Sequence, residues 1–208
     1  MDRMGDSGGD LSNLILILQL AYSGERAAAY AYRGHWHSVR NPDERTRIEA
    51  IENEEWHHRN LVGEMLRALG ARPDRLKEVR ATIIGRTLQA LCHVSGWFAP
   101  MYGAGKLESR NIREYEAAAR FALGSGHEEF VDCLLTMAEV EWEHEHYFRS
   151  KVLSHPAGRL LPIWPLPPPK EDIRSSFASR SWVCRTGGKA LSNTSELPLE
   201  RRTSRRLY

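Results

Sequence analysis

Two segments of the chain place a glutamate and a histidine three residues apart around a tryptophan, and this repeat constrains the fold more than any other feature. They read Glu55-Trp56-His57-His58 and Glu141-Trp142-Glu143-His144. Residues three apart lie on one face of an α-helix, so both side chains can bind the same metal ion. Each segment is therefore predicted to be part of a metal site that is built on facing helices.

Apolar neighbours indicate which histidine of each segment points into the protein. The positions three, four, seven and eight residues beyond His58 are all apolar, whereas those beyond His57 include Asn60 and Glu64. The same comparison favours His144 over His146. We expect four residues to point inward: Glu55, His58, Glu141 and His144. We expect four residues to be solvated on the helix flanks: Glu54, His57, Glu143 and His146.

Apolar periodicity and helix-end signals predict five helical segments before residue 155. They span about residues 10–37, 42–69, 74–91, 106–123 and 127–153. Asp10 or Ser12 is expected to cap the first helix, and the glycines and proline of residues 96–105 are expected to break the chain before the fourth. The short turns favour antiparallel neighbours. The predicted fold is an all-α antiparallel four-helix bundle with an extra helix in the crossover.

The C-terminal quarter differs from the rest of the chain in composition. Residues 155–208 carry ten basic and four acidic side chains, whereas residues 1–154 carry 19 basic and 23 acidic ones. The tail contains Pro-Leu-Pro-Pro-Pro at 165–169 and few periodic apolar positions. We predict a helical domain at 1–154 and a Pro/Arg/Ser-rich extension at 155–208, docked or disordered, with Trp164 and Phe177 as anchors. The excess of basic residues is confined to this tail, so it does not indicate a nucleic-acid-binding domain, and the arginines of 201–206 are interpreted as a solvated terminus.

Two further glutamates lie on apolar helix faces of the other two bundle helices. Glu25 shares its face with Leu18, Tyr22 and Tyr32, where a carboxylate is costly unless it is paired or bound to a metal. The alternative is a salt bridge between Glu25 and Arg33.

The fourth helix offers three candidate acids, Glu108, Glu114 and Glu116, of which Glu108 shares a face with Ile112 and Tyr115. Glu25 precedes Glu55 by 30 residues and Glu108 precedes Glu141 by 33, so the pattern Glu…Glu-Trp-x-His occurs twice. Each copy fits a helix, a turn and an antiparallel return that bring the acid level with the Glu-x-x-His pair.

Four carboxylates and two imidazoles suit iron or manganese, and this is the ligand set of ferritin-like di-iron carboxylate proteins. Structural zinc and a metal-free bundle with surface Glu/His pairs are the alternatives. The apolar residues of the crossover, among them Ile83, Ile84, Leu88 and Leu91, either form an entry surface for a bulky substrate or cover the bundle.

The sequence resembles the demethoxyubiquinone hydroxylase family of the ferritin-like superfamily over about residues 12–153. The resemblance is carried by SGERAAAYAY at 23–32, EEWHHRNLVGEML at 54–66, LESRNIREY at 107–115 and EVEWEHEHYF at 139–148. It implies that two irons are bound by Glu25, Glu55, His58, Glu108, Glu141 and His144. It also implies that Tyr115 is a catalytic neighbour of the cluster.

The activity implied by the resemblance is O2-dependent hydroxylation of a quinone ring, with electrons from an external donor and with the enzyme against a membrane surface. Other interpretations are a ferritin- or rubrerythrin-like oxidase or peroxidase, a tRNA-hydroxylase-like enzyme, and a non-enzymatic helical interaction module. Self-association is left open. The three widely spaced cysteines lack a CxxC pair, and the apolar run at 14–18 is short. We therefore expect a cytoplasmic protein in a reducing compartment.

Overall fold

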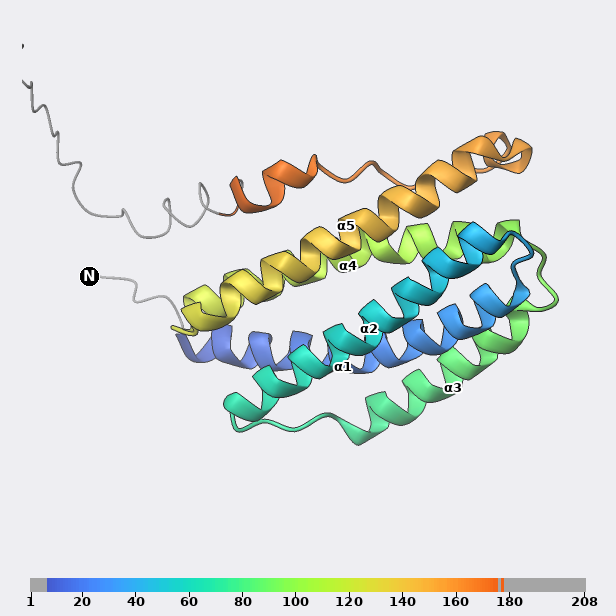
Figure 1. Cartoon of the computed structure of the whole chain (residues 1–208). Coiled ribbons are helices and arrows are strands. Elements are labelled where there is room, and N and C mark those ends of the chain that lie inside the picture. The colour runs from blue at the N-terminus through green and yellow to red at the C-terminus, as the bar shows by residue number, and fades with distance from the viewer. Residues whose placement is uncertain (1–6, 176, 178–208) are drawn as a thin grey trace, which may run out of the picture.

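The computed structural model describes residues 7–175 and 177, and these residues form helices and loops without a strand (Figure 1). The α-helices are α1 (Ser7–Ser38), α2 (Pro42–Ala68), α3 (Arg75–Cys92), α4 (Phe98–Gly124) and α5 (Val131–Ser154). Short 3-10 turns lie at Glu128–Phe130 and Pro156–Arg159. The prediction of an all-α bundle with an additional crossover helix is confirmed.

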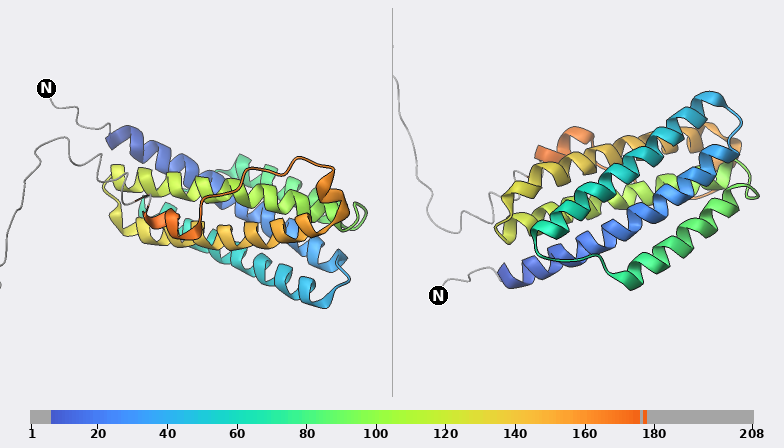
Figure 2. Two further views of the ribbon diagram at one scale, coloured as in Figure 1. Left: turned by 90° about the horizontal axis from the view of Figure 1, so that it is seen from above. Right: turned by 60° about the horizontal axis from the view of Figure 1, so that its bottom comes forward.

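The bundle consists of two antiparallel hairpins, α1 with α2 and α4 with α5, which meet along α1 and α4 (Figures 1 and 2). Asn41 caps α2, since its side chain accepts hydrogen bonds from the backbone N–H groups of Asp43 and Glu44. In the turn after α4, Gly126 has a φ of 83°, a left-handed conformation that favours glycine. Short turns thus hold the helices of each hairpin side by side.

The crossover helix α3 packs against α1 on the outside of the bundle (Figure 2, right). The two helices approach closely at Gly85, where a Cβ atom would lie 2.7 Å from the backbone oxygen of Ala27. Glu78 ties α3 to both neighbouring helices, because its Oε2 lies 2.6 Å from an Nη atom of Arg59 and 2.9 Å from one of Arg26. These contacts fix α3 although it lies outside the four-helix core.

Two helix starts differ from the sequence-based prediction. Asp10 and Ser12 lie within α1 and do not cap it, and Ser12 donates instead to the backbone oxygen of Gly8. Helix α4 begins at Phe98, so the predicted start near residue 106 was wrong. Pro100 is tolerated because the first N–H groups of a helix have no intrahelical partner. Gly105 also lies within α4, and its lack of a side chain leaves room for Trp164, a ring atom of which lies 2.4 Å from where a Cβ would be.

The apolar core is divided into two clusters by a polar layer. One cluster includes Leu14, Leu18, Leu66 and Leu134, and the other includes Ile48 and Phe148. Along each bundle helix, one of Glu25, Glu55, Glu108 and Glu141 lies between residues of the two clusters. The bundle is therefore stabilised by apolar packing on both sides of a central layer of acids.

The described part of the C-terminal extension lies along α4 and α5 (Figure 2, left). Trp164 is buried, and its Nε1–H donates to Glu145 across 2.6 Å. The indole N–H of Trp142 donates to the backbone oxygen of Pro168 across 2.8 Å, and Arg174 binds Glu139 on α5. Ile173 and Phe177 are buried at the end of the described segment. The arginine cluster predicted at 201–206 lies outside the described residues.

Candidate metal centre

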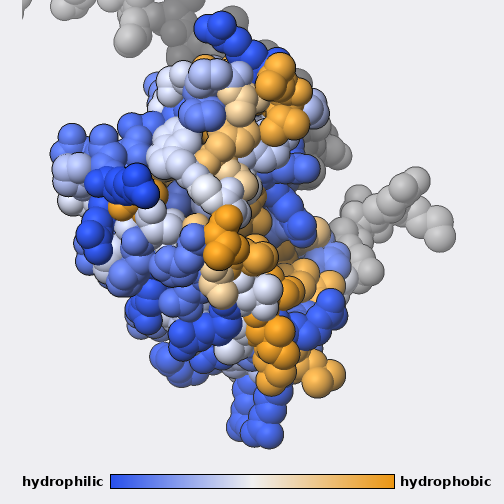
Figure 3. Space-filling view, turned by 90° about the vertical axis from the view of Figure 1, so that its right-hand side faces the viewer, coloured by the Kyte–Doolittle hydropathy of each residue, from blue (hydrophilic) through white to orange (hydrophobic). Residues whose placement is uncertain are grey.

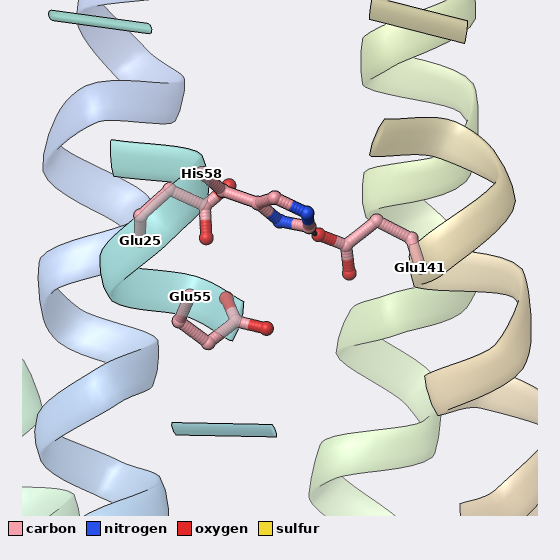
Figure 4. A group of neighbouring side chains, drawn as sticks. All are labelled: Glu25, Glu55, His58 and Glu141. Carbon is pink, nitrogen blue, oxygen red and sulfur yellow. Dashed lines mark hydrogen bonds and ion pairs between the residues drawn. The ribbon is translucent and has the colours of Figure 1, made fainter. Parts of the chain in front are cut away.

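The central layer of the bundle contains all six residues predicted as metal ligands. Each bundle helix contributes: Glu25 comes from α1, Glu55 and His58 from α2, Glu108 from α4, and Glu141 and His144 from α5. All six are at most 3 % exposed. Figure 4 shows four of them, with His58 extending from α2 toward Glu141 on α5.

The six residues form two overlapping groups, each with ligand atoms that all lie within 4.8 Å of one another. One group is Glu25, Glu55, His58 and Glu141, and the other is Glu55, Glu108, Glu141 and His144. Glu55 and Glu141 belong to both groups. A carboxylate has two oxygen atoms, so these two glutamates can each bind two neighbouring cations. The geometry is that of two adjacent metal positions joined by two carboxylates.

Close contacts between histidine and glutamate connect the two hairpins through this layer. Nδ1 of His58 lies 3.0 Å from Oε1 of Glu141. Nδ1 of His144 lies 3.3 Å from Oε1 of Glu55 and 3.7 Å from Oε2 of Glu141. The imidazoles of α2 and α5 therefore each face a carboxylate of the opposite hairpin.

Several polar atoms of the cluster are buried and make no hydrogen bond of regular geometry among the described residues, although Nδ1 of His144 and Oε1 of Glu55 lie close to each other. The buried atoms are Oε2 of Glu25, both carboxylate oxygens of Glu55, and Nδ1 of His144. Leaving a buried polar atom unpaired costs free energy, and the cost is larger for a charged group. All of these atoms belong to residues of the two overlapping groups, so a pair of cations between them would satisfy them.

The pKa values reflect four carboxyl groups that share a small buried volume. Burial, followed by the charge of Glu141, raises the pKa of Glu55 and of Glu108 well above the usual value, and burial also raises the pKa of Glu25. Burial acts in the same direction on Glu141, but its hydrogen bonds to Glu108, His144 and His58 outweigh it and hold its pKa well below the usual value. Without a cation, the cluster concentrates its negative charge on Glu141.

Two tyrosines connect the hairpins in a reciprocal way. The hydroxyl of Tyr115 on α4 donates to Glu25 on α1, and the hydroxyl of Tyr32 on α1 donates to Glu108 on α4. Tyr115 was predicted to be beside the cluster, whereas the role of Tyr32 was missed. Each tyrosine follows the glutamate of its own helix by seven residues, so the repeat itself contained the signal. Asn111 adds a third donor, with Nδ2 3.0 Å from Oε2 of Glu108.

One flank residue is not where the helix phase placed it. His57, Glu143 and His146 are exposed, as expected. Glu54 was expected to be solvated, but its side chain is 39 % exposed and its Oε2 lies 2.6 Å from Nε2 of His144. The prediction was wrong because α5 approaches this flank of α2. The alternative partner proposed for Glu25, Arg33, instead forms an ion pair with Glu52 at 2.6 Å.

Two cavities lie along the groove between α1 and α4. The smaller, of about 60 Å³, is lined by Glu25 and Tyr115 together with apolar side chains. The larger, of about 430 Å³, lies between α1, α3 and α4 and is lined by Tyr32. Ala28 and Leu107 line both cavities, so the two are neighbours. The groove thus places apolar cavities next to Tyr32 and Tyr115, whose hydroxyls donate hydrogen bonds to glutamates of the cluster.

A helical bundle with four glutamates and two histidines at its centre defines the ferritin-like class of di-iron carboxylate proteins. Comparison with protein families gives one match, to the family of the ubiquinone biosynthesis protein COQ7, over residues 13–118. The match spans about half of the chain, and the chain belongs to this family. Its members are di-iron hydroxylases, so the chain is an enzyme. Neither the curated proteins nor the solved structures include a match to it.

The matched span includes α1, α2, α3 and most of α4, and with them Glu25, Glu55, His58 and Glu108. It ends before α5, which contributes Glu141 and His144. Glu141 and His144 thus lie outside the matched span, and the structure places them beside the ligand candidates that lie within it.

Proposed function

We propose that the chain is an iron-dependent hydroxylase that uses O2 to hydroxylate the ring of a quinone-like substrate in ubiquinone biosynthesis. The observation that carries the proposal is the pair of overlapping ligand groups that share Glu55 and Glu141. Glu25 and His58 would complete one metal position, and Glu108 and His144 the other. Family membership supports the reaction class.

The donor set fits iron. Carboxylates and imidazoles are hard and borderline ligands that suit iron and, as a second choice, manganese. The described cysteines lie elsewhere: Cys92 is on α3, and Cys133 is at the start of α5. The unpaired atoms of Glu25, Glu55 and His144 are those that a pair of cations would bind.

A bound iron pair would supply the binding and reduction of O2. The chain's own residues supply the surroundings in which that occurs. Burial and the neighbouring Glu108 and Glu25 raise the pKa values of Tyr32 and Tyr115, respectively, well above the usual value. Both hydroxyls therefore keep their protons at neutral pH and remain donors to these carboxylates. The apolar clusters on either side keep water out of the layer.

The substrate volume is the groove between α1 and α4. The larger cavity is lined mainly by apolar and small residues, and its volume is in the range of sites for small molecules. A ring with a hydrocarbon substituent matches such a lining. Hydroxylation places one atom of O2 on the ring and releases the other as water, which requires two electrons from an external donor.

An apolar helix face supports the proposed contact with a membrane surface. On α3, Val79, Ile83, Ile84 and Leu91 are exposed, so these residues do not simply cover the bundle. Figure 3 shows apolar side chains in a band that runs from the upper to the lower part of that view. The exposed Arg75, Arg80 and Arg86 lie on the same helix and would face anionic lipid headgroups. None of the described helices has the length and apolarity that a membrane-spanning segment needs.

A single-turnover experiment tests the proposed reaction. The full-length protein is first loaded with Fe²⁺ in the absence of oxygen and mixed with a short-chain benzoquinone that lacks one ring substituent. The mixture is then chemically reduced and exposed to isotopically heavy O2. We expect a product that has gained one labelled oxygen atom, seen by mass spectrometry. Oxidation of the iron without labelled product would instead support a ferritin- or rubrerythrin-like oxidase. A protein that binds no metal would support the non-enzymatic interpretation.

A further inference from the structure

The larger cavity is lined by a buried imidazole that the metal centre does not use. The cavity of about 430 Å³ is lined by one face each of α1, α3 and α4, and most of its lining is alanine, leucine, glycine or proline. His35, in the last turns of α1, also lines it. Its side chain lies one helical turn beyond Tyr32, which hydrogen-bonds Glu108.

His35 is buried, and its ring has no hydrogen-bond partner. The residue is 2 % exposed, yet among the described residues no group is within hydrogen-bonding geometry of Nδ1 or Nε2. Burying an imidazole without a partner is costly, because its interactions with water are lost and not replaced. His35 lines the cavity, but neighbouring atoms cover both ring nitrogens. A ligand in the cavity would supply the missing partner once the ring, or the atoms that cover it, shift to admit the ligand.

The ring of His35 is held in place by aromatic packing. Its plane lies nearly parallel to those of Tyr32 and Phe148, with ring centroids 6.4 Å and 5.9 Å away. Burial lowers the pKa of His35 to about 4, although the charge of Glu44 acts in the opposite direction. At neutral pH the ring is therefore uncharged, with one N–H donor and one acceptor nitrogen. Such a ring recognises a neutral oxygen and does not select for an anion.

We propose that His35 is the polar anchor of a ligand site in this cavity, where its N–H donates a hydrogen bond to an oxygen atom of an aromatic or quinone ring. The apolar lining from α3 and α4 holds the hydrocarbon part of the same ligand. The identity of the ligand as a quinone rests on the proposed function, whereas the cavity and its unpaired histidine do not. The hydrogen bond orients the ring relative to Tyr32 and the cluster beyond it.

A binding measurement with two probes tests the role of His35. Full-length, metal-loaded protein is kept without oxygen and titrated by calorimetry with a decyl-substituted dimethoxy-methyl-benzoquinone and with decylbenzene, which has no oxygen. We expect the variant His35→Phe to bind the quinone about three- to tenfold more weakly, the effect of one lost hydrogen bond, and to bind decylbenzene as the wild type does. His35→Gln, which retains a donor, should recover part of the difference.

A second variant tests the cavity independently of His35. Gly103 on α4 lines the cavity, and a Cβ atom added there would meet nothing within 4 Å. The helix backbone therefore has room for a side chain at this position, and the variant Gly103→Leu should place apolar atoms against the cavity and weaken binding of both probes at least tenfold. Ser125→Ala, in the turn after α4, is the matched control and should change neither affinity.

The outcomes separate the anchor from the proposed reaction. Equal quinone affinity of wild type and His35→Phe, with both folded by circular dichroism, would overturn the role of His35, as would unchanged binding in Gly103→Leu. Hydroxylation without any effect of these variants on quinone binding would leave the proposed function intact and refute the anchor. Binding that depends on His35 in a protein that hydroxylates no quinone would refute the reaction and retain the site.

Discussion

Glu54 on α2 holds His144 on α5, with its Oε2 2.6 Å from Nε2 of the imidazole. If Nε2–H donates to this carboxylate, Nδ1 is left to face Glu55, whose Oε1 lies 3.3 Å away. A carboxylate that accepts the outer N–H of a metal-binding histidine fixes the orientation and tautomer of the ring. Glu54 is therefore positioned to orient one of the six proposed ligands.

Replacing Glu54 should weaken metal binding although Glu54 is not among the proposed ligands. We expect Glu54→Ala to lower the affinity for Fe²⁺ by about 10- to 100-fold, the usual effect of removing such a partner, because the imidazole of His144 loses its fixed orientation. Competition with a chelator measures the affinity. Glu49→Ala, an exposed glutamate on the same helix, is the control and should bind as the wild type does. Equal affinities in the two variants would contradict the positioning role.

Adjacent histidines on α2 provide a direct test of the proposed ligands. His58 is 3 % exposed and faces Glu141, whereas His57 is exposed. We expect the wild type to hold about two iron ions per chain and His58→Ala to lose most of this iron with the helices intact, as Glu55→Ala and His144→Ala should. His57→Ala should retain the iron. Metal analysis together with circular dichroism decides the matter, and full iron content in His58→Ala would refute the assignment.

Metal uptake should release protons. Burial raises the pKa values of Glu25, Glu55 and Glu108, while the hydrogen bonds of His144 to Glu141 and Glu54 outweigh its burial and raise its pKa to about 9. His144 therefore holds its proton in the metal-free protein at neutral pH, the raised pKa values of the three carboxyl groups act in the same direction, and ligands must give up protons to bind a cation. The affinity for Mn²⁺ or Fe²⁺ should therefore rise with pH between about pH 6 and 8. A pH indicator in weak buffer measures the release, and uptake without a pH change would contradict the prediction.

His35 should make the metal-free protein less stable in acid. The pKa of the His35 imidazole is about 4 in the folded chain and near 6.5 in the unfolded chain. As the pH falls from 6.5 towards 4, the imidazole therefore binds a proton in the unfolded chain but not in the folded chain. The free energy of unfolding should therefore fall by about 2 kcal/mol more in the wild type than in His35→Phe between about pH 7 and 5. Urea unfolding at both pH values measures the difference. His57→Phe, at an exposed histidine, should behave like the wild type.

The extension after α5 should contribute to the stability of the bundle. Trp164 fills the space over Gly105 and donates to Glu145. Removing such a buried side chain leaves a cavity, so Trp164→Ala should lower the free energy of unfolding by about 3 kcal/mol or more. Leu166→Ala, in the same segment but 74 % exposed, should change it little. A thermal or urea melt measures both, and equal stability of the two variants would show that the extension does not stabilise the fold.

Much of the proposed centre could be predicted from local sequence. The spacing of Glu55 and His58, and of Glu141 and His144, places both members of each pair on one helix face, and apolar neighbours show which face is inward. Glu25 and Glu108 follow from the same logic applied to the first helix of each hairpin. Local periodicity determines such phases because the side-chain direction along a helix is fixed by its geometry.

Contacts between helices could not be predicted in the same way. Glu54 lies on the flank of α2 by phase, and only the approach of α5 brings His144 to it. Each tyrosine lies two helical turns from the glutamate of its own helix, and only the packing of α1 against α4 brings it to the glutamate of the other. The close packing of Trp164 on Gly105 joins residues more than fifty positions apart, and a side chain at Gly105 would collide with the indole.

The sequence by itself thus determined the helices, the repeated hairpin and the six side chains that point to the centre, because helix phase is a local property. The tertiary structure alone decided that Glu55 and Glu141 are shared between two groups, that His35 faces a cavity without a partner, and that the apolar residues of α3 remain exposed. These features depend on distances between helices far apart in the chain, which no local pattern encodes.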